Sequence, residues 1–205
     1  MSADEPPTVP TRTRPVDATR ERILDAVIEA ASIHGIARLS VSDVAHRAGL
    51  SRPTLYKHFA SKDELVSAAV QREAERFVAQ VVAVTERGLP PREGVEAAVL
   101  VALQQTRRHP LLDRIVRTEP ETLVPLLTSD TGAVMLLVRH TAEAIISNTM
   151  PGLAPVGTRR FADVITRLLI SYAISAPDDP PEVVAHAVAS ILIDGALASS
   201  TREGP

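Results

Sequence analysis

Hydroxyl, imidazole and cationic side chains follow one another closely between residues 51 and 62. A helix over 52–59 would place Leu55 and Phe59 on its inward side, because successive residues are separated by roughly 100° around a helix. The side chains that remain outside are Arg52, Pro53, Thr54, Tyr56, Lys57 and His58. Such groups can meet base edges and phosphates. The pattern is typical of a helix that enters the major groove of DNA, and an ordinary solvated polar surface is the alternative.

A second short helix is predicted just before this one, and it supplies the surface on which the outer helix packs. Val41, Val44, Ala45 and Ala48 are spaced so that they share one inward face. Gly49 follows, and glycine tolerates the positive φ that a tight turn between two helices requires. Small residues beside such a turn let the helices cross closely. The segment predicts a helix-turn-helix.

Capping signals mark the ends of these helices. Ser40 with Asp43 predicts an N-terminal cap for the second helix, and Ser61 with Glu64 predicts a capping box for a long fourth helix. The first helix is expected to begin after Asp17 or Thr19 and to end at Gly35. Later helices are expected at about 92–108, 111–117, 120–127, 132–148, 158–175 and 181–199. Because no segment alternates like a strand, the predicted fold class is all-α.

Composition and charge limit the classes of function. The chain has 205 residues, no cysteine and a net charge of −3, with nine basic and seven acidic residues up to Lys62 and an acidic excess beyond it. A weakly basic N-terminal part permits phosphate binding. The absence of cysteine excludes disulfides and thiolate chemistry. Without a signal-peptide pattern or a long apolar span, we expect a cytoplasmic protein.

The segment VSDVAHRAGLSRPTLYKHFASKDEL, with the lead-in ILDAVIEAASIHGIARLSV, resembles the N-terminal domain of the tetracycline-repressor (TetR) family of bacterial regulators. Its most specific part is the run LYKHF-x-x-K. By this resemblance, the residues that would contact bases or phosphates are Ser51, Arg52, Pro53, Thr54, Lys57 and His58. Tyr56 and Lys62 would each bind a phosphate. Ser40 and Ser42 are further candidate phosphate donors, although Ser40 is already explained as a cap.

The last two predicted helices carry apolar residues on more than one face, so they need burial on two sides. The resemblance implies that these helices form a four-helix bundle in a homodimer. A dimer would present two recognition helices to a palindrome in double-stranded operator DNA, about 34–36 Å apart or somewhat more. A wholly intramolecular core is the alternative.

The resemblance also implies a cavity for a small-molecule effector among the helices of residues 92–175. Its expected lining is mostly aliphatic, which suits a hydrophobic or acyl-bearing molecule. The polar residues that could enter it are Gln104, Gln105, His109, Arg139, His140, Glu143 and Asn148. For each of them, solvent exposure or a helix-end hydrogen bond is the competing interpretation. His140 and Glu143 lie one turn apart, but two ligands alone do not predict a metal site, and no cofactor is expected.

The sequence thus predicts a ligand-responsive transcription regulator, a repressor that an effector releases from DNA. Three parts are expected: a flexible arm over 1–16, a helix-turn-helix domain over 17–65, and an effector-binding and dimerisation domain over 66–205. Arg12 and Arg14 of the arm could touch DNA, but a solvated tail is the favoured interpretation. A constitutive DNA-binding protein without a ligand is the alternative. An enzyme is disfavoured, since the chain has no glycine-rich phosphate loop, HExxH or G-x-S-x-G motif.

Overall fold

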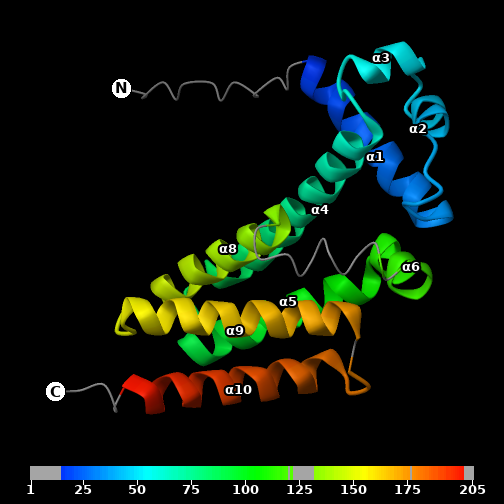
Figure 1. Cartoon of the computed structure of the whole chain (residues 1–205). Helices are drawn as coiled ribbons and strands as arrows, with labels where there is room; N and C mark the ends of the chain where they lie inside the picture. The colour runs from blue at the N-terminus through cyan, green and yellow to red at the C-terminus, as the bar shows by residue number, and fades with distance from the viewer. Residues whose placement is uncertain (1–14, 120, 122–131, 176, 201–205) are drawn as a thin grey trace, which may run out of the picture.

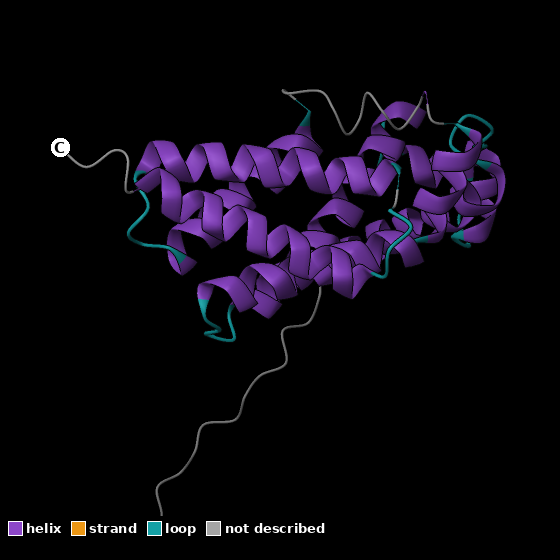
Figure 2. Cartoon of the chain, turned by 90° about the horizontal axis from the view of Figure 1, so that it is seen from below, coloured by secondary structure: helices purple, strands orange, loops and turns teal. Residues whose placement is uncertain are grey.

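The computed structural model describes residues 15–119, 121, 132–175 and 177–200, and all regular structure within these ranges is helical (Figures 1 and 2). The helices are α1 (Pro15–His34), α2 (Val41–Arg47), α3 (Arg52–Tyr56), α4 (Lys62–Thr85), α5 (Pro91–Arg108), α6 (Pro110–Thr118), α8 (Ala133–Thr149), α9 (Pro155–Ile174) and α10 (Pro181–Ser200). The prediction of an all-α fold is confirmed. The arm up to residue 14 and the helix expected at 120–127 lie outside the described residues, apart from Glu121.

Helices α1–α3 form a small unit at one end of the molecule, which we call the head, and α4–α10 form the body (Figure 1). The head is closed by large buried side chains, among them Leu24, Leu55 and Phe59. Leu111 and Ile115 of α6 belong to this same core. The head core is therefore completed by a helix of the body.

Helix α1 begins earlier than the sequence predicted, at Pro15 instead of after Asp17 or Thr19. Proline suits this place because its fixed φ fits the first helical turn, where its missing N–H costs nothing. The predicted end is close: the helix stops at His34, and Gly35 follows with a φ of +84°. The Gly35 N–H donates to the Ala31 carbonyl at 2.8 Å and closes the last turn.

The turn between α2 and α3 is built as expected. Gly49 has a φ of +68°, its N–H donates to the His46 carbonyl at 3.0 Å, and the Leu50 N–H donates to the Ala45 carbonyl at 2.8 Å. This pair of bonds is a Schellman motif, which ends a helix at a glycine. Gly49 thus fixes the direction in which the chain enters α3.

The predicted cap of α2 is wrong in its chemistry. Ser40 stands at the N-cap position with an extended backbone, but its side chain makes no capping hydrogen bond. Asp43 instead accepts a hydrogen bond from Arg47 Nε at 3.2 Å, one turn along the helix. An i, i+4 ion pair has replaced the capping box at this helix.

The caps of α3 and α4 are formed. Ser51 Oγ accepts from the Thr54 N–H at 3.2 Å, and Ser61 Oγ accepts from the Glu64 N–H at 3.1 Å. Glu64 reaches back and accepts from the Ala60 N–H at 2.7 Å. These bonds satisfy N–H groups that a helix start leaves without partners.

The body is a stack of long helices with α5 at its centre. Helix α5 packs on α4, α9 and α10, and α8 packs on both α4 and α9. Viewed from below, the long helices of the body lie side by side (Figure 2). A second core, built largely from Val, Ala, Leu and Ile, joins α5 to α9 and α10. Helix α4 continues from this stack to the head, so it connects both parts of the molecule.

Candidate nucleic-acid interface and ligand pocket

Helix α3 presents its polar side to solvent because its apolar side is buried. Leu55 is fully buried and Phe59 is 1% exposed, as their helical phase predicted. The helix is shorter than expected and ends at Tyr56 instead of Phe59. The His58 N–H donates to the Leu55 carbonyl three residues back, at 2.9 Å, which tightens the last turn. Lys57 and His58 consequently extend from a turn at the end of the helix.

The predicted DNA-contact residues belong to the segments 40–42 and 51–58 of the head and to Lys62 at the start of α4, and none of them is buried. The exposed members are Ser40, Ser42, Ser51, Arg52, Pro53, Tyr56 and Lys57, and the half-buried members are Thr54, His58 and Lys62. Their chemistry is that of a nucleic-acid surface: hydroxyls, cations and one aromatic ring that is 43% exposed. Arg52 and Lys57 have no ion-pair partner within the described part of the chain, so their charges face solvent.

Two other cations of the head already have partners. Lys62 Nζ donates to the Ala37 carbonyl at 3.3 Å, which ties the start of α4 to the loop after α1. Arg47 bonds to Asp43 and Glu29, and the hydrogen bond to Asp43 is the main cause that raises the pKa of the Arg47 guanidinium. Arg47 is therefore directed at carboxylates of the head.

Arg20 is a residue that the sequence did not single out. Its guanidinium lies 5.1 Å from the centre of the Phe59 ring, in a cation–π contact between α1 and the turn after α3. Residues this far apart in the chain carry no local signal of such a contact. The exposed Arg20 adds positive charge beside the α3 surface.

A network of ion pairs around a buried arginine joins the head to the body. Arg72 of α4 is 7% exposed and pairs with Glu21 of α1 at 3.2 Å, Asp25 of α1 at 2.8 Å and Glu73 at 2.8 Å. Arg76, one turn further, contacts the same three carboxylates. Because each carboxylate is shared by both arginines, this network holds α1 against α4.

Glu119, directly after α6, forms a second joint, that is, a second polar contact between the body and the head. Its carboxylate is buried and accepts a hydrogen bond from the Ala37 N–H at 3.0 Å. The same carboxylate lies where a Cβ on Gly35 would be, so a side chain at position 35 would have to displace Glu119, and the positive φ there also favours glycine. This residue was not predicted from the sequence, because nothing local marks a carboxylate that reaches a turn 82 positions earlier.

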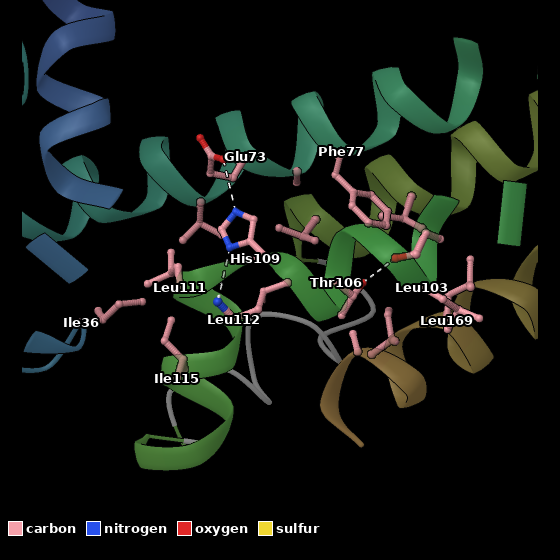
Figure 3. Close-up of a pocket in the computed structure, with 17 residues that line it drawn as sticks. Ile36, Glu73, Phe77, Leu103, Thr106, His109, Leu111, Leu112, Ile115 and Leu169 are labelled. Atoms are coloured by element: carbon pink, nitrogen blue, oxygen red, sulfur yellow. Dashed lines mark hydrogen bonds and ion pairs between the residues drawn. The ribbon is translucent and has the colours of Figure 1, made fainter. Parts of the chain in front are cut away.

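A cavity of about 140 Å³ lies where the body meets the head. Figure 3 shows its lining, which comes from α4, α5, α6, α8 and α9 together with Ile36 of the loop after α1. Most lining side chains are aliphatic, as the sequence predicted. Leu111 and Ile115 line this cavity and also belong to the head core. A second apolar cavity of about 60 Å³ shares Phe77, Val138 and Leu169 with the first.

The polar end of the cavity is a carboxylate–imidazole pair (Figure 3). His109 Nε2 lies 3.4 Å from Glu73 Oε2, and His109 Nδ1 accepts the Leu112 N–H at 3.4 Å. The hydrogen bond from His109 lowers the pKa of Glu73 to about 2, with help from Arg72 and Arg76 and against the opposing effect of burial. Glu73 is thus ionised at neutral pH.

Of the predicted ligand-binding residues, the structure places His109 in this cavity. Gln104 donates to Glu182 at 3.2 Å and lies outside it, and Gln105, Arg139 and Glu143 are half-buried but line neither cavity. His140 and Asn148 lie in an open groove between α4 and α8. Glu73 and Thr106 are lining residues that the sequence analysis missed. Within the described residues, no three His, Asp or Glu side chains are grouped as a metal site would need.

A helix-turn-helix with an exposed basic helix, carried on a helical body, defines a DNA-binding transcription regulator. The chain belongs to the TetR family. Residues 23–69 match the family description "Bacterial regulatory proteins, tetR family", and residues 91–193, half of the chain, match "Bacterial Tetracyclin repressor, C-terminal domain". The family consists of regulators, so the prediction that the chain is not an enzyme is confirmed.

Curated relatives agree with this assignment. The chain is 26% identical to the transcriptional regulator RutR of Escherichia coli K12 over 81% of this chain and 79% of RutR. It is 39% identical to the transcriptional repressor KstR of Rhodococcus jostii over 45% of this chain and 43% of KstR, and 35% identical to the transcriptional activator FasR of Mycolicibacterium smegmatis over 42% and 39%. The chain spans about half the length, or less, of the first curated relatives that it matches.

Solved structures show the same fold. The TetR family repressor AlkX of Dietzia sp. strain DQ12-45-1b has a TM-score of 0.70 at 22% identity, over 86% of this chain and 97% of AlkX. The fatty acid degradation regulator FadR of Bacillus halodurans has a TM-score of 0.61 at 16% identity, over 90% and 98%. Within the described residues, no helix has the length and apolar character needed to cross a membrane.

Proposed function

We propose that the protein is a repressor that binds palindromic operator DNA as a homodimer and is released by a small hydrophobic effector. The observation that carries the proposal is the shared wall between cavity and head. Leu111 and Ile115 contact both the cavity and the head core, and Ile36 of the head lines the cavity directly. A ligand that needs more room must displace residues on which the head packs, so it favours one head position over another.

DNA binding is assigned to the α3 surface of the head, within a DNA-binding domain of residues 17–65. Arg52 and Lys57 are exposed cations without ion pairs among the described residues, whereas Arg47 and Lys62 are engaged inside the head. We infer that Arg52 and Lys57 carry the larger part of the phosphate attraction. Ser51, Thr54, Tyr56 and His58 would supply directional hydrogen bonds beside them.

The test for DNA binding is a salt titration followed by fluorescence anisotropy on DNA from the region upstream of the gene. Arg52→Ala with Lys57→Ala should weaken binding and reduce the salt slope by about 2, since each lost phosphate contact removes roughly 0.9. The matched control is Arg87→Ala with Arg108→Ala, which removes two exposed charges from the body. If both double variants bind like the parent protein, the assignment fails.

Dimerisation is assigned to α9 and α10, in the proposed effector-binding and dimerisation domain of residues 66–205. Val164 of α9 is 52% exposed, and Val183 and Ile191 of α10 are 53% and 72% exposed. Large aliphatic side chains that are exposed on two adjacent helices favour burial against a partner chain. Ile191→Asp should therefore yield a monomer in light scattering, whereas Ile33→Asp, at an exposed position in the head, should leave a dimer. A dimer in both variants would contradict this interface.

The effector is assigned to the cavity of about 140 Å³ because its described lining is mostly aliphatic. AlkX is described as implicated in biodegradation of n-alkanes and FadR as a fatty acid degradation regulator, and both of those substrates carry apolar chains. Native mass spectrometry of freshly purified protein should show a retained apolar molecule. Adding that molecule back to the stripped protein should release the DNA, and a constitutive binder would keep it bound.

A further inference from the structure

The cavity between the body and the head has room for a small molecule. Its volume is about 140 Å³. A dry protein cavity of roughly 150 Å³ holds one benzene molecule, which has six carbon atoms. The cavity in its present shape therefore admits an aliphatic group of about six carbons.

The hydrogen-bonding groups of its described lining belong to Glu73, Thr106 and His109, and their donors are already used. Thr106 Oγ1 donates to the Ala102 carbonyl at 2.8 Å, which leaves its lone pairs directed elsewhere. His109 Nδ1 accepts from the Leu112 N–H, so the ring proton is on Nε2 and is directed at Glu73. Glu73 Oε1 already accepts from Arg72 and Arg76. What remains toward a ligand is acceptor capacity: the Thr106 oxygen and the second lone pair of Glu73 Oε2.

Charge at this end of the cavity is negative. Glu73 is ionised, and the described lining contains no Lys or Arg. Arg72 and Arg76 pair with Glu73 at 2.8 and 3.1 Å. They also bind Glu21 and Asp25, so three carboxylates share two cations, and neither arginine lines the cavity. A second carboxylate in the cavity would lose water and gain neither a cation nor a donor in return.

We propose that the cavity selects an aliphatic ligand whose polar group is a hydrogen-bond donor, an alcohol or a protonated amine, and that it rejects carboxylates. The proposal rests on the proposed function of the cavity as the effector site. It narrows the sequence-based expectation of a hydrophobic or acyl-bearing effector, because free acids are excluded. Thr106 and Glu73 are the residues that set this specificity.

The test uses four probes of nearly equal size: 1-hexanol, hexylamine, hexanoate and methyl pentyl ether. The ether is an isomer of hexanol that accepts a hydrogen bond but cannot donate one. The difference in affinity between the two therefore measures the contribution of the donor group. Binding to the full-length protein without DNA is followed by NMR on the methyl groups of Leu103, Ile115 and Leu169, which line the cavity. We expect hexanol and hexylamine to bind, with the ether and hexanoate at least tenfold weaker. Comparing hexanol with hexylamine shows whether the charge of Glu73 is used in addition to its acceptor atoms.

Two variants separate specificity from folding. Thr106→Val keeps the side-chain shape and should reduce hexanol binding to the level of the ether. Glu73→Gln removes the negative charge and should bring hexanoate and hexylamine to within a few-fold of each other. The matched control is Glu96→Gln, because Glu96 forms a comparable carboxylate–imidazole pair with His186, at 3.1 Å, outside both cavities. It should leave all four affinities unchanged.

Equal affinity for hexanol and its ether isomer, tighter binding of hexanoate, or no binding of any probe would each overturn the proposal. Operator binding and its release are measured separately with the same protein. Release of DNA by a carboxylate that binds this cavity would overturn the specificity and leave the proposed function standing. Selective hexanol binding by a protein that binds no DNA would support the specificity and overturn the proposed function.

Discussion

The head and the body are built from similar aliphatic helices, yet they differ in how completely their interiors are filled. Ile23, Leu24, Leu55 and Leu65 in the head core are fully buried, and Phe59 closes it with a 1% exposed ring. Both apolar cavities lie within the body or where the body meets the head. A filled core has one low-energy arrangement, whereas a core with cavities can repack around a guest. This difference suits a rigid DNA-contact surface in the head, carried on a body that can repack around a ligand.

The two regions are also connected differently on their two sides. On the α1–α4 side, Arg72 and Arg76 hold shared carboxylates, and on the α6 side Glu119 bonds to the loop after α1. The cavity lies between these joints, with Glu73 beside one and Ile115 near the other. A ligand there can affect both joints at once.

The largest effect is expected from removing an aromatic ring in the filled core. Phe59→Ala should lower the free energy of unfolding by about 3–4 kcal/mol, because a buried ring leaves a cavity that rigid neighbours cannot fill. Phe77→Ala removes the same ring from a half-buried place on the cavity wall and should cost only about 1–2 kcal/mol. Urea unfolding of both variants measures the difference. Equal losses would show that the head and body cores are equally adaptable.

An intermediate effect is expected at the α6 joint. Gly35→Ala and Gly49→Ala both force a positive φ on an alanine, which costs about 1–2 kcal/mol. At Gly49 the new Cβ meets open space, whereas at Gly35 it would overlap the Glu119 carboxylate. Gly35→Ala should therefore be the more destabilising, at about 2–3 kcal/mol, in the same urea assay.

The double variant Gly35→Ala, Glu119→Ala is the control for this comparison. Truncating Glu119 removes the overlap, so part of the loss should be recovered as a non-additive coupling between the two sites. Strict additivity of the two substitutions would contradict the packing of Glu119 against Gly35.

The sequence predicted those parts of the molecule that depend on local pattern. Helical phase identified Leu55 and Phe59 as buried, and the preference for positive φ placed the turn at Gly49, because each signal lies within a few residues. The Ser40 capping bond was wrong: Ser40 holds the N-cap position without a side-chain bond, and the Asp43 carboxylate pairs with Arg47. Glu73 and Glu119 were missed because their roles depend on partners in distant helices.

The smallest effect is expected at the α4 joint, and it depends on pH. The folded protein lowers the pKa of Glu73 from its ordinary value of 4.5 to about 2, so the ionised carboxylate stabilises the fold. This contribution is complete above about pH 5 and is lost as the pH falls through the window from 4.5 to 2. After allowance for solvent screening, it amounts to about 1–2 kcal/mol.

Glu73→Gln should therefore be less stable than the parent protein at pH 7 and approach it near pH 2, as measured by urea unfolding across this range. The other carboxylates of the network, Glu21 and Asp25, are present in both proteins and cancel in the difference. Glu96→Gln, which removes the surface pair with His186, should run parallel to the parent curve. A Glu73→Gln curve that also runs parallel would mean that this carboxylate contributes no pH-dependent stability, and that its contacts with His109 and Arg72 position the helices without stabilising the fold.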